Sequence, residues 1–482
     1  MKLNFLIGLL VLTQTLFAQV FTEVSTPELE ASVGSIAVSD VNGDNHNDVL
    51  ITGQNNSGGK IAKLYMNDGM GNFTEIIGTP FDGVEQSSIA FSDVNGDGTD
   101  DILITGQDNT FFGSAKLYIN DGMGNFTEMV GTTFEGVIRS SIAFSDVNGD
   151  IHEDVLITGL NNSNEVSTKL YINDGTGNFT EMVGTPFEAI SRGSIAFADV
   201  NGNGNNDVLI TGRNSSNQEI TKLYTNDGLG NFTEMTGTPF ESVAVSSIAF
   251  SDINGDNNDD VLITGQVSSN EGIAKLYTND GMGNFNELIG TPFDGVAASS
   301  IAFADVNGDG NEDVLITGVN NSSEQIAKLY INDGIGNFAE ITGTSFEGVQ
   351  NGSIAFSDFN GNGNNDVLIS GRNSSTQPST KLYINGGISS TNNLNNRFNL
   401  NITSFPNPLK TNNLNLSFNS LSNDFITVTI FGYNGTLLSQ YNEFTGIGQQ
   451  TISVPTASLR PGNYLIQLDN GKDKGVAKFI VQ

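Results

Sequence analysis

The sequence of 482 residues contains no cysteine and only two histidines. The lack of cysteine excludes disulfide bonds and thiolate chemistry, although a large repeat array has enough core to fold without disulfides. Positive charge is also scarce, because 19 lysines and arginines stand against 54 acidic residues, for a formal net charge of −35. This charge would repel nucleic acid and anionic lipid headgroups, and it suits divalent cations. We therefore expect no nucleic-acid partner.

Long apolar segments are missing beyond the N-terminus. There, Lys2 precedes the mostly apolar run Phe5–Phe17, and Ala18 is a small residue suitable before a cleavage point. This pattern predicts a secretory signal peptide over residues 1–19, too short for a stable membrane anchor. A buried N-terminal strand or helix is the alternative. No later stretch approaches the roughly 20 apolar residues of a transmembrane helix, so we expect no transmembrane segment in the mature chain.

The sequence does contain a nine-residue acidic loop, repeated seven times at a constant spacing of 53 residues. The second copy runs from Asp93 to Asp101 and reads DVNGDGTDD. The same motifs surround each loop, namely SIAFSD, VLITG, KLYIND, GxGNFTE and GTPF. A fixed period of this length marks a repeat architecture. The repeats fill residues 20–388, a polar stretch over 389–400 is typical of a linker, and residues 401–482 differ in composition.

Each repeat contains four short runs with strand character. In the second repeat they are Ser88–Ser92, Ile102–Thr105, Lys116–Asn120 and Phe126–Val130. They are rich in β-branched and aromatic residues and are bounded by Gly, Asn and Asp. A sheet of four such strands cannot bury both faces alone, and stacking copies around an axis solves this problem. The sequence therefore predicts an all-β, seven-bladed β-propeller, since the rival β-solenoid has shorter repeats of about 20–30 residues.

The two ends of the repeat region favour a closed ring. The seventh repeat has its third strand at Lys381–Ile384, and no fourth strand follows. The missing piece lies at the other end, where Phe21–Val24 precedes the first repeat as FTEM precedes later ones. We expect this N-terminal strand to complete the seventh blade and to remove a sheet edge.

The acidic loop has the donor pattern of a calcium site. Oxygen-bearing side chains occupy positions 1, 3, 5 and 9, glycine occupies position 4, and position 7 offers a backbone carbonyl. Calcium takes about six to eight oxygen ligands. The two histidines, His46 and His152, both occupy position 7, where the ring would point away, so zinc or copper is not expected. The alternative is a set of Asx turns without metal.

Calcium is thus the expected cofactor, with up to seven ions. The candidate ligands are Asp40, Asn42, Asp44, His46, Asp48, Asp93, Asn95, Asp97, Thr99, Asp101, Asp146, Asn148, Asp150, His152, Asp154, Asp199, Asn201, Asn203, Asn205, Asp207, Asp252, Asn254, Asp256, Asn258, Asp260, Asp305, Asn307, Asp309, Asn311, Asp313, Asp358, Asn360, Asn362, Asn364 and Asp366.

The seven loops are not equivalent. Copies four and seven carry Asn203 and Asn362 at position 5, where the other copies have aspartate, so they are expected to bind calcium more weakly. The third copy has Ile151 at position 6, where the others have Gly or Asn. A positive φ would be costly for a β-branched residue, so we expect a distorted third loop.

With these motifs, the repeats resemble FG-GAP or VCBS-type repeats, known from integrin α-subunit propellers and many bacterial surface proteins. The resemblance implies a propeller with calcium in the loop that joins the first and second strands. It also implies adhesion or ligand binding more often than catalysis. The second recurrent motif, NDGxGNF at Asn67–Phe73, is similar to the turn of VCBS-type units. We interpret it as a structural hairpin turn between strands three and four.

One face of the array varies in sequence. The connections between strands two and three read GQDNTFFGSAK, GLNNSNEVSTK and GRNSSNQEITK in three consecutive repeats. Such variation marks a binding surface, or drift in loops free of constraint. The candidate ligand-face residues are Phe111, Phe112, Arg139, Arg192, Arg213 and Arg372. No asymmetric cluster of acid, base or nucleophile stands out, so the chain is not expected to be an enzyme.

The last segment has alternating apolar runs and Gly or Asn turns, which indicate a small Ig-like β-sandwich. It closely resembles the type A C-terminal sorting domain of the type IX secretion system of Bacteroidota. The matching features are the start Phe405-Pro-Asn-Pro408, the GYNGTLL turn, the LRPGNYLIQL strand and the end VAKFIVQ. The resemblance implies passage through the periplasm, translocation by the type IX machinery, removal of this domain, and release or surface attachment. An Ig-like adhesive module is the alternative.

These features predict a secreted or cell-surface calcium-binding propeller that serves as a binding or adhesion module for an extracellular glycan or protein. The alternatives are a polysaccharide-active lyase or hydrolase built on a propeller, and a passive structural surface protein.

Overall fold

The structure is a computed structural model that describes residues 19–26, 29–388, 403–406, 408–410, 413–420, 424–432, 437–446, 448–457, 459–469 and 474–482. The expected signal peptide up to residue 18 and the expected linker 389–400 lie outside the described residues. The chain divides into two compact units, Met1–Ile388 and Ser389–Gln482. Throughout the described ranges every regular element is a β-strand. None of the described segments is a helix long and apolar enough to cross a membrane.

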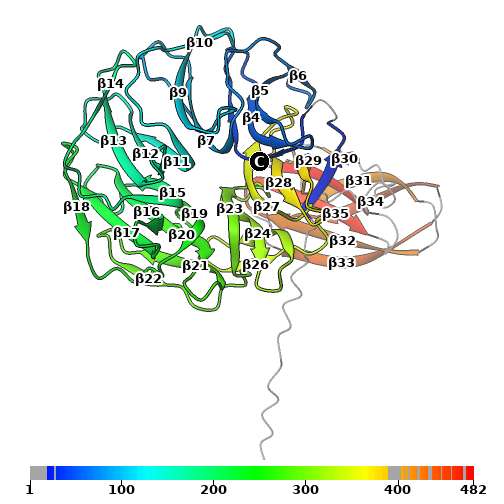
Figure 1. The fold of residues 1–482 in the computed structure, drawn as a ribbon. Coiled ribbons are helices and arrows are strands. Elements are labelled where there is room, and N and C mark those ends of the chain that lie inside the picture. Colours follow the sequence, from blue (N-terminus) through cyan, green and yellow to red (C-terminus); the bar gives the residue numbers. More distant parts are fainter. Residues whose placement is uncertain are drawn as a thin grey trace, which may run out of the picture. The chain divides into compact units, whose positions relative to one another are not determined.

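The first unit is an array of antiparallel strand groups that follow one another around a ring (Figure 1). The group of the first repeat consists of β2 (Ser32–Val33), β3 (Ile36–Ser39), β4 (Asp48–Asn55), β5 (Lys60–Asn67) and β6 (Phe73–Glu75). The next groups are β7 (Glu85–Ser92), β8 (Asp101–Gln107), β9 (Gly113–Asn120) and β10 (Phe126–Glu128), and β11 (Val137–Ser145), β12 (Asp154–Asn161), β13 (Val166–Asn173) and β14 (Phe179–Glu181).

The remaining groups repeat this plan. They are β15 (Ile190–Ala198), β16 (Asp207–Asn214), β17 (Glu219–Asn226) and β18 (Phe232–Met235); β19 (Ala244–Ser251), β20 (Asp260–Gln266), β21 (Gly272–Asn279) and β22 (Phe285–Glu287); β23 (Val296–Ala304), β24 (Asp313–Asn320), β25 (Gln325–Asn332) and β26 (Phe338–Glu340); and β27 (Val349–Ser357), β28 (Asp366–Asn373) and β29 (Pro378–Ile388).

The last group takes its fourth strand from the start of the chain. β1 (Gln19–Val24) pairs antiparallel with β29, and Phe21 lies opposite Asn385. The first phenylalanine of the fourth strand holds the same register in the second repeat. Glu23 forms an ion pair with Lys381 at 3.1 Å, and the second repeat has an equivalent lysine–glutamate pair at 3.0 Å. β1 therefore occupies the place that the fourth strand holds in the other groups.

The core lies between neighbouring groups. In β8, Ile102, Leu103 and Ile104 are each at most 2% exposed, as expected for a central strand that is covered on both faces by other sheets. One hydrophobic cluster combines residues of the second repeat, such as Leu103, with residues of the third, such as Val155 and Tyr171. Each sheet thus buries its two faces against its two neighbours, which is why a single repeat would not be stable alone.

A buried asparagine at the end of each third strand ties neighbouring groups together. Asn120 at the end of β9 donates through Nδ2 to the backbone carbonyl of Val41, which belongs to the preceding acidic loop, at 2.9 Å. Equivalent bonds recur in all seven repeats. The asparagine of the NDGxGNF motif is therefore a link between groups as well as part of a turn.

The second unit consists of two antiparallel sheets. One contains β30 (Thr403–Phe405), β31 (Asn413–Ser420) and β34 (Gly448–Pro455), and the other β33 (Leu437–Thr445), β32 (Asp424–Gly432), β35 (Gly462–Asp469) and β36 (Lys474–Val481). Leu416 and Val454 of the first sheet share one hydrophobic cluster with Val428 and Ile466 of the second. The period-two alternation of the sequence supplies these inward-facing residues.

Candidate functional site

Each acidic loop joins the first and second strands of its repeat and is folded around its first aspartate. In the second repeat, Asp93 Oδ1 accepts hydrogen bonds from the backbone amides of Gly96 and Asp97, at 2.8 and 3.1 Å, and its Oδ2 accepts one from Gly98 at 2.8 Å. Position 5 caps the loop in turn, because Asp97 Oδ1 accepts from the Thr99 amide at 2.9 Å. The Asx-turn geometry predicted as the alternative to metal binding is thus present.

The aspartate at position 9 of each loop is buried beside the exposed carboxylates. Asp48 is fully buried, and its two oxygens accept from the backbone amides of Val41 and Asn67, at 3.2 and 2.8 Å. The pKa of Asp48 is raised to about 6, chiefly by burial. The charges of Asp44 and Asp40 also raise this pKa, and the two backbone hydrogen bonds partly oppose the increase. The donor set of carboxylate and amide oxygens is the one that a hard cation such as calcium prefers. Within the described residues, no three acidic or histidine side chains converge as metal ligands.

The side chain at position 7 packs against the neighbouring hairpin turn. The His46 ring lies over Gly69 of the NDGxGNF motif, where a Cβ atom would overlap the imidazole. Gly69 has a φ of 72°, which also favours glycine. The same relationship holds between His152 and Gly175. The two histidine rings therefore lie against the hairpin turn.

The expected distortion of the third loop is not observed. Ile151 adopts a φ of 71°, close to the 66° of Asn45 in the first loop, and its side chain is 86% exposed. Its backbone amide donates to Asp146 Oδ2 at 2.8 Å, as in the other loops. The hydrogen bonds of the loop hold its backbone in the common conformation. Ile151 therefore bears the energetic cost of a positive φ, and the loop does not change its conformation to avoid it.

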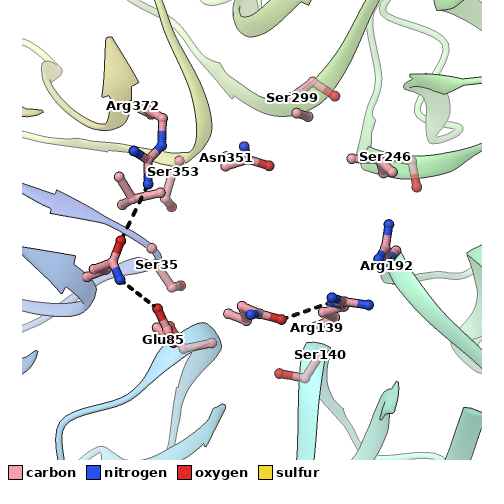
Figure 2. A pocket seen from close by; sticks show the side chains of 18 of the residues that line it. Ser35, Glu85, Arg139, Ser140, Arg192, Ser246, Ser299, Asn351, Ser353 and Arg372 are labelled. Atoms are coloured by element: carbon pink, nitrogen blue, oxygen red, sulfur yellow. Dashed lines mark hydrogen bonds between the residues drawn. The ribbon is translucent and has the colours of Figure 1, made fainter. Parts of the chain in front are cut away.

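An axial pocket of about 570 Å³ opens where the first strands begin and the second strands end. Figure 2 shows its side chains around an open centre, with Arg139 and Arg192 next to each other and Arg372 on another side. The pocket lies at the face of the strand two–strand three connections, opposite the acidic loops. Serine hydroxyls contribute much of the remaining wall, including Ser140 and Ser246.

A β-bulge in the first strand directs one residue per group to this pocket. In β11 the register against β12 shifts between Ile138 and Ser141, and Arg139 in between has a positive φ. The equivalent residues share this left-handed conformation: Gln86 (51°), Arg139 (52°), Arg192 (56°), Val245 (52°), Ala298 (50°) and Asn351 (51°). Bulges re-aim side chains in this way. Because Val245 adopts the same conformation despite its β-branch, the bulge is imposed by the fold and does not depend on the residue present.

The charges around the pocket are unevenly paired. Glu85 forms an ion pair with Lys60 at 3.2 Å and accepts a hydrogen bond from Gln54 at 3.2 Å. Arg139 donates from Nε to the uncharged Gln86 at 2.9 Å. In the part of the chain that the structure describes, no carboxylate forms an ion pair with Arg139, Arg192 or Arg372. Partial burial lowers the pKa of Arg192, and the charges of Arg139 and Arg213 lower it further.

Comparison with protein-family models matches the FG-GAP-like repeat six times, over residues 40–104, 93–157, 146–210, 199–263, 252–316 and 305–369. Each match begins at one acidic loop and extends through the next, so the overlapping matches contain all seven loops. The chain belongs to the FG-GAP-like repeat family. A second model, the secretion system C-terminal sorting domain, matches residues 403–482. This match supports secretion through the type IX system and a location outside the cell or on its outer surface.

No curated protein sequence matches this FG-GAP-like chain. Among solved structures, a fungal alcohol oxidase in complex with copper aligns at 12% identity with a TM-score of 0.49, covering 96% of this chain and 100% of its own. The fucose-recognising six-bladed β-propeller lectin of Aleuria aurantia aligns at 11% identity with a TM-score of 0.35, covering 77% and 96%. A thermostable family-43 glycoside hydrolase aligns at 10% identity with a TM-score of 0.29, covering 69% and 97%.

The structure separates the predicted ligand-face residues of the FG-GAP-like propeller into two sets. Arg139, Arg192 and Arg372 line the axial pocket, whereas Phe111 and Phe112 lie on the β8–β9 hairpin outside it, 75% and 60% exposed. The Phe111 ring lies 4.7 Å from Nζ of a lysine in the first repeat. The remaining arginine of the set, in β16, forms a 2.6 Å ion pair with a glutamate of β17.

Sequence reasoning missed the serines and the bulge residues without charge. Ser140, Ser246, Ala298 and Asn351 line the pocket but carry no distinctive motif. A signal was nevertheless available in the sequence. The bulge position, which lies shortly before the nearly constant SIAFSD segment, holds valine, glutamine, arginine, alanine or asparagine in different repeats.

Proposed function

We propose that the protein is a secreted or cell-surface binding module, and that the axial pocket of its propeller receives an extracellular ligand. The observation that supports this proposal is the contrast between the pocket and the rest of the repeat. The residues at the bulge position differ from group to group, while the flanking SIAFSD and VLITG segments are almost constant. A pocket of about 570 Å³ also falls within the range of roughly 300–1,000 Å³ that is typical of ligand sites.

We further propose that the ring has seven blades. This is supported by the seven acidic loops, by the pairing of β1 with β29, and by the asparagine bond that joins the first repeat to the seventh. A closed ring fixes the number of bulge residues at the axis, and therefore the size of the pocket. On this proposal the pocket is one composite site that no single repeat could form.

Calcium is proposed as the structural cation of the acidic loops. Support comes from the oxygen donor set and from the burial of Asp48 and its equivalents in loops that carry three further acidic or amide side chains, at positions 1, 3 and 5. The candidate ligands at positions 1, 3, 5 and 9, with the backbone carbonyl at position 7, would hold the ion. Bound calcium would neutralise carboxylates that otherwise repel one another at short range. The loops with Asn203 and Asn362 would bind it more weakly.

The C-terminal unit is proposed to be an Ig-like sandwich that serves only for sorting, as in type IX substrates of Bacteroidota. Removal of residues 401–482 is expected to leave the propeller folded, because the repeats and the sorting unit have separate cores. In the native host, the truncated protein would remain in the periplasm. Normal surface delivery of the truncated form would contradict this role.

A binding module can be distinguished from an enzyme and from a passive surface protein by one set of measurements. The purified chain, with calcium, is applied to a glycan array and to extracellular matrix proteins, and the same glycans are assayed for product release. We expect binding without product. Released product would indicate a polysaccharide-active lyase or hydrolase, and absence of any ligand would favour a passive structural role.

Two variants locate the site. Ala298→Phe places a large side chain in the pocket at a bulge position that already accommodates valine and arginine elsewhere in the ring, so it should block binding without unfolding the chain. The double variant Phe111→Ala/Phe112→Ala tests the outer hairpin. Loss of binding in the double variant alone would place the site on the outer face of the β8–β9 hairpin and not in the pocket.

A further inference from the structure

The axial pocket concentrates positive charge in a strongly acidic protein. The chain has a formal net charge of −35 and contains six arginines. Three of them, Arg139, Arg192 and Arg372, line this one pocket. Arg139 and Arg192 come from the bulges of adjacent groups, β11 and β15, and Arg372 comes from the end of β28. These three residues are 53 or more residues apart in sequence, so only closure of the ring brings them together.

Among the described residues, the arginines of the pocket have no anionic partner. The single carboxylate of the lining, Glu85, is already paired with Lys60 at 3.2 Å. Arg139 donates to an amide oxygen, and Arg372 donates to the Thr376 carbonyl at 2.9 Å. Guanidinium groups bind carboxylate and sulfate oxygens with two parallel hydrogen bonds, and such charge-assisted bonds are about twice as strong as neutral ones. The arrangement is therefore suited to an anionic group supplied from outside.

The wall beside Arg192 departs from the repeat pattern. In neighbouring repeats a serine follows the bulge residue and shares a hydrogen bond with a threonine of the adjacent sheet, such as Ser140 with Thr105 at 2.8 Å. Gly193 replaces this serine after Arg192, and a Cβ atom there would overlap the backbone carbonyl of Thr211 in β16. The hydroxyl group of Thr158, the threonine that would pair with such a serine, has no hydrogen-bond partner within the described residues. The ring of serines is thus interrupted beside the pair of adjacent arginines, as it also is at Gly34 and Gly352.

We propose that the axial pocket binds one acidic sugar residue of a glycan, with Arg139, Arg192 and Arg372 holding its carboxylate or sulfate group. This inference rests on the proposed function, because it assumes that the pocket is the ligand site. The volume of about 570 Å³ exceeds the needs of a free anion and suits a sugar residue. The serine hydroxyls and amide groups of the lining offer partners for sugar hydroxyls.

The charge distribution also favours a terminal acidic residue over a long polyanion. Outside the pocket, the propeller surface carries a large excess of aspartate and glutamate. A polymer with a charge on every unit would be repelled by that surface wherever it left the pocket. A glycan that ends in one acidic sugar would place its charge on the arginines and leave neutral units near the acidic surface.

Isothermal titration calorimetry of the full chain tests the proposal with four probes of similar length. They are a neutral galactose oligosaccharide, the same oligosaccharide ending in a uronate, the same oligosaccharide ending in a sulfated galactose, and oligoglutamate. We expect the uronate or the sulfated probe to bind at least tenfold more tightly than the neutral probe, and the better of the two identifies the group. Arg192→Gln should weaken acidic binding by roughly 10- to 100-fold, as expected for a hydrogen bond to a charged group.

Two further variants make the result independent of folding defects. Arg460→Gln removes the same charge from an exposed position in the sorting unit and should leave binding unchanged. Val245→Arg adds a guanidinium at the equivalent bulge of the next group and should tighten binding of the acidic probe. If the neutral probe binds as tightly as the acidic probes, and if Arg192→Gln leaves its affinity unchanged, the acidic-sugar inference fails while the proposed binding function stands. Equally tight binding of oligoglutamate would show that the ligand is not a sugar. Absence of binding to every probe, by the parent and by Val245→Arg, would overturn the inference. The proposed binding function itself would fail only if the glycan array and the matrix proteins also showed no ligand.

Discussion

The Nδ2 group of Asn67 donates a hydrogen bond of 3.0 Å to the backbone carbonyl of Phe359, which lies 292 residues further along the chain. Asn67 belongs to the first repeat and Phe359 to the seventh acidic loop. Elsewhere in the ring the same bond spans 79 residues, as between Asn226 and Val147. The contact between the ends of the array therefore uses the same chemistry as every internal contact.

Replacement of Asn67 by alanine should destabilise the propeller by about 2–4 kcal/mol. Asn67 is 2% exposed, and its loss leaves the Phe359 carbonyl and the amide of Gly69 without their partner, a penalty of about 1–3 kcal/mol for each buried group. Urea denaturation followed by circular dichroism measures the effect. The control is Asn72→Ala, which removes an exposed amide from the same turn and should cost under about 1 kcal/mol. Equal effects of the two variants would show that the link between groups adds no stability.

The N-terminal strand can be tested with two neighbouring substitutions. Phe21 is 6% exposed and packs against Phe346 with ring centroids 5.0 Å apart, so Phe21→Ala should cost about 3–5 kcal/mol. Glu23→Gln removes only the exposed ion pair with Lys381 and should cost less than about 1 kcal/mol. Deletion of Val20–Val24 should expose the edge of β29 and cause aggregation, visible in size-exclusion chromatography. A truncated chain that melts like the parent and stays monomeric would refute closure by β1.

Seven buried tyrosines predict a loss of stability at high pH. Burial raises the pKa of Tyr118 and Tyr330 to about 12, and in Tyr118 a backbone hydrogen bond and Lys116 oppose this effect. The unfolded chain ionises its tyrosines near pH 10, while the folded chain keeps these protons. Stability is therefore fully present below about pH 10 and declines as the pH rises toward 12.

The alkaline transition can be followed by tyrosinate absorbance and circular dichroism in parallel. We expect the ionisation of the buried tyrosines to coincide with unfolding, and Tyr118→Phe to reduce the slope of stability against pH. Ionisation near pH 10 with unchanged circular dichroism would show that these hydroxyls titrate freely in the folded protein.

Calcium should raise the melting temperature of the propeller, because an ion that binds only the folded state stabilises it by mass action. The measurement is a thermal melt with calcium and with chelator, and an unchanged melting temperature would contradict the proposal. Asp97→Ala should remove one ion from the binding stoichiometry. Asp108→Ala is the matched control, since it removes the same charge from the β8–β9 hairpin of that repeat. Asn203→Asp should tighten the fourth site.

Ile151→Asn should stabilise the chain by about 1 kcal/mol. Ile151 holds a φ of 71°, a left-handed conformation that costs an ordinary residue roughly 1–2 kcal/mol, and asparagine adopts it more readily. Asn45 and Asn257 occupy the equivalent positions in two other loops with φ values of 66° and 63°. The melting temperature reports the change, and Asn257→Ile should produce the opposite shift. A decrease in stability for Ile151→Asn would contradict the conformational cost assigned to Ile151.

The strand order was accessible from the sequence because the repeat supplies the same pattern seven times. In the second repeat three of the four expected runs lie wholly in strands, the fourth extends two residues beyond the end of β10 at Glu128, and the all-β propeller with FG-GAP-like repeats is confirmed. The boundaries differ where apolar alternation gives no guidance. β7 begins at Glu85, three residues before the expected Ser88, because the strand continues beyond its bulge.

The pocket was less accessible. A residue such as Arg139 has no propensity for a positive φ, so no local signal indicates that it lies in a bulge. Arg139 lines the pocket together with Arg192 and Arg372, which lie 53 and 233 positions further along the chain, and only the closure of the ring brings the three residues together. Sequence variation indicated the face on which this pocket opens, whereas the separation of the pocket arginines from the Phe111–Phe112 hairpin required the three-dimensional arrangement.

Strand β1, which pairs with β29 in the folded chain, has a second possible partner while the chain is being synthesised. It emerges first, and its partner β29 emerges last, yet the KLY segment of β29 is repeated in β5, only some forty residues after β1. β1 could therefore dock on β5 before β29 exists. The segment that competes with it, β6, follows β5 after a turn of five residues, and closing a short loop costs less entropy than closing a long one. Proximity along the chain thus favours β6 over β1 as the partner of β5 and leaves β1 available for β29.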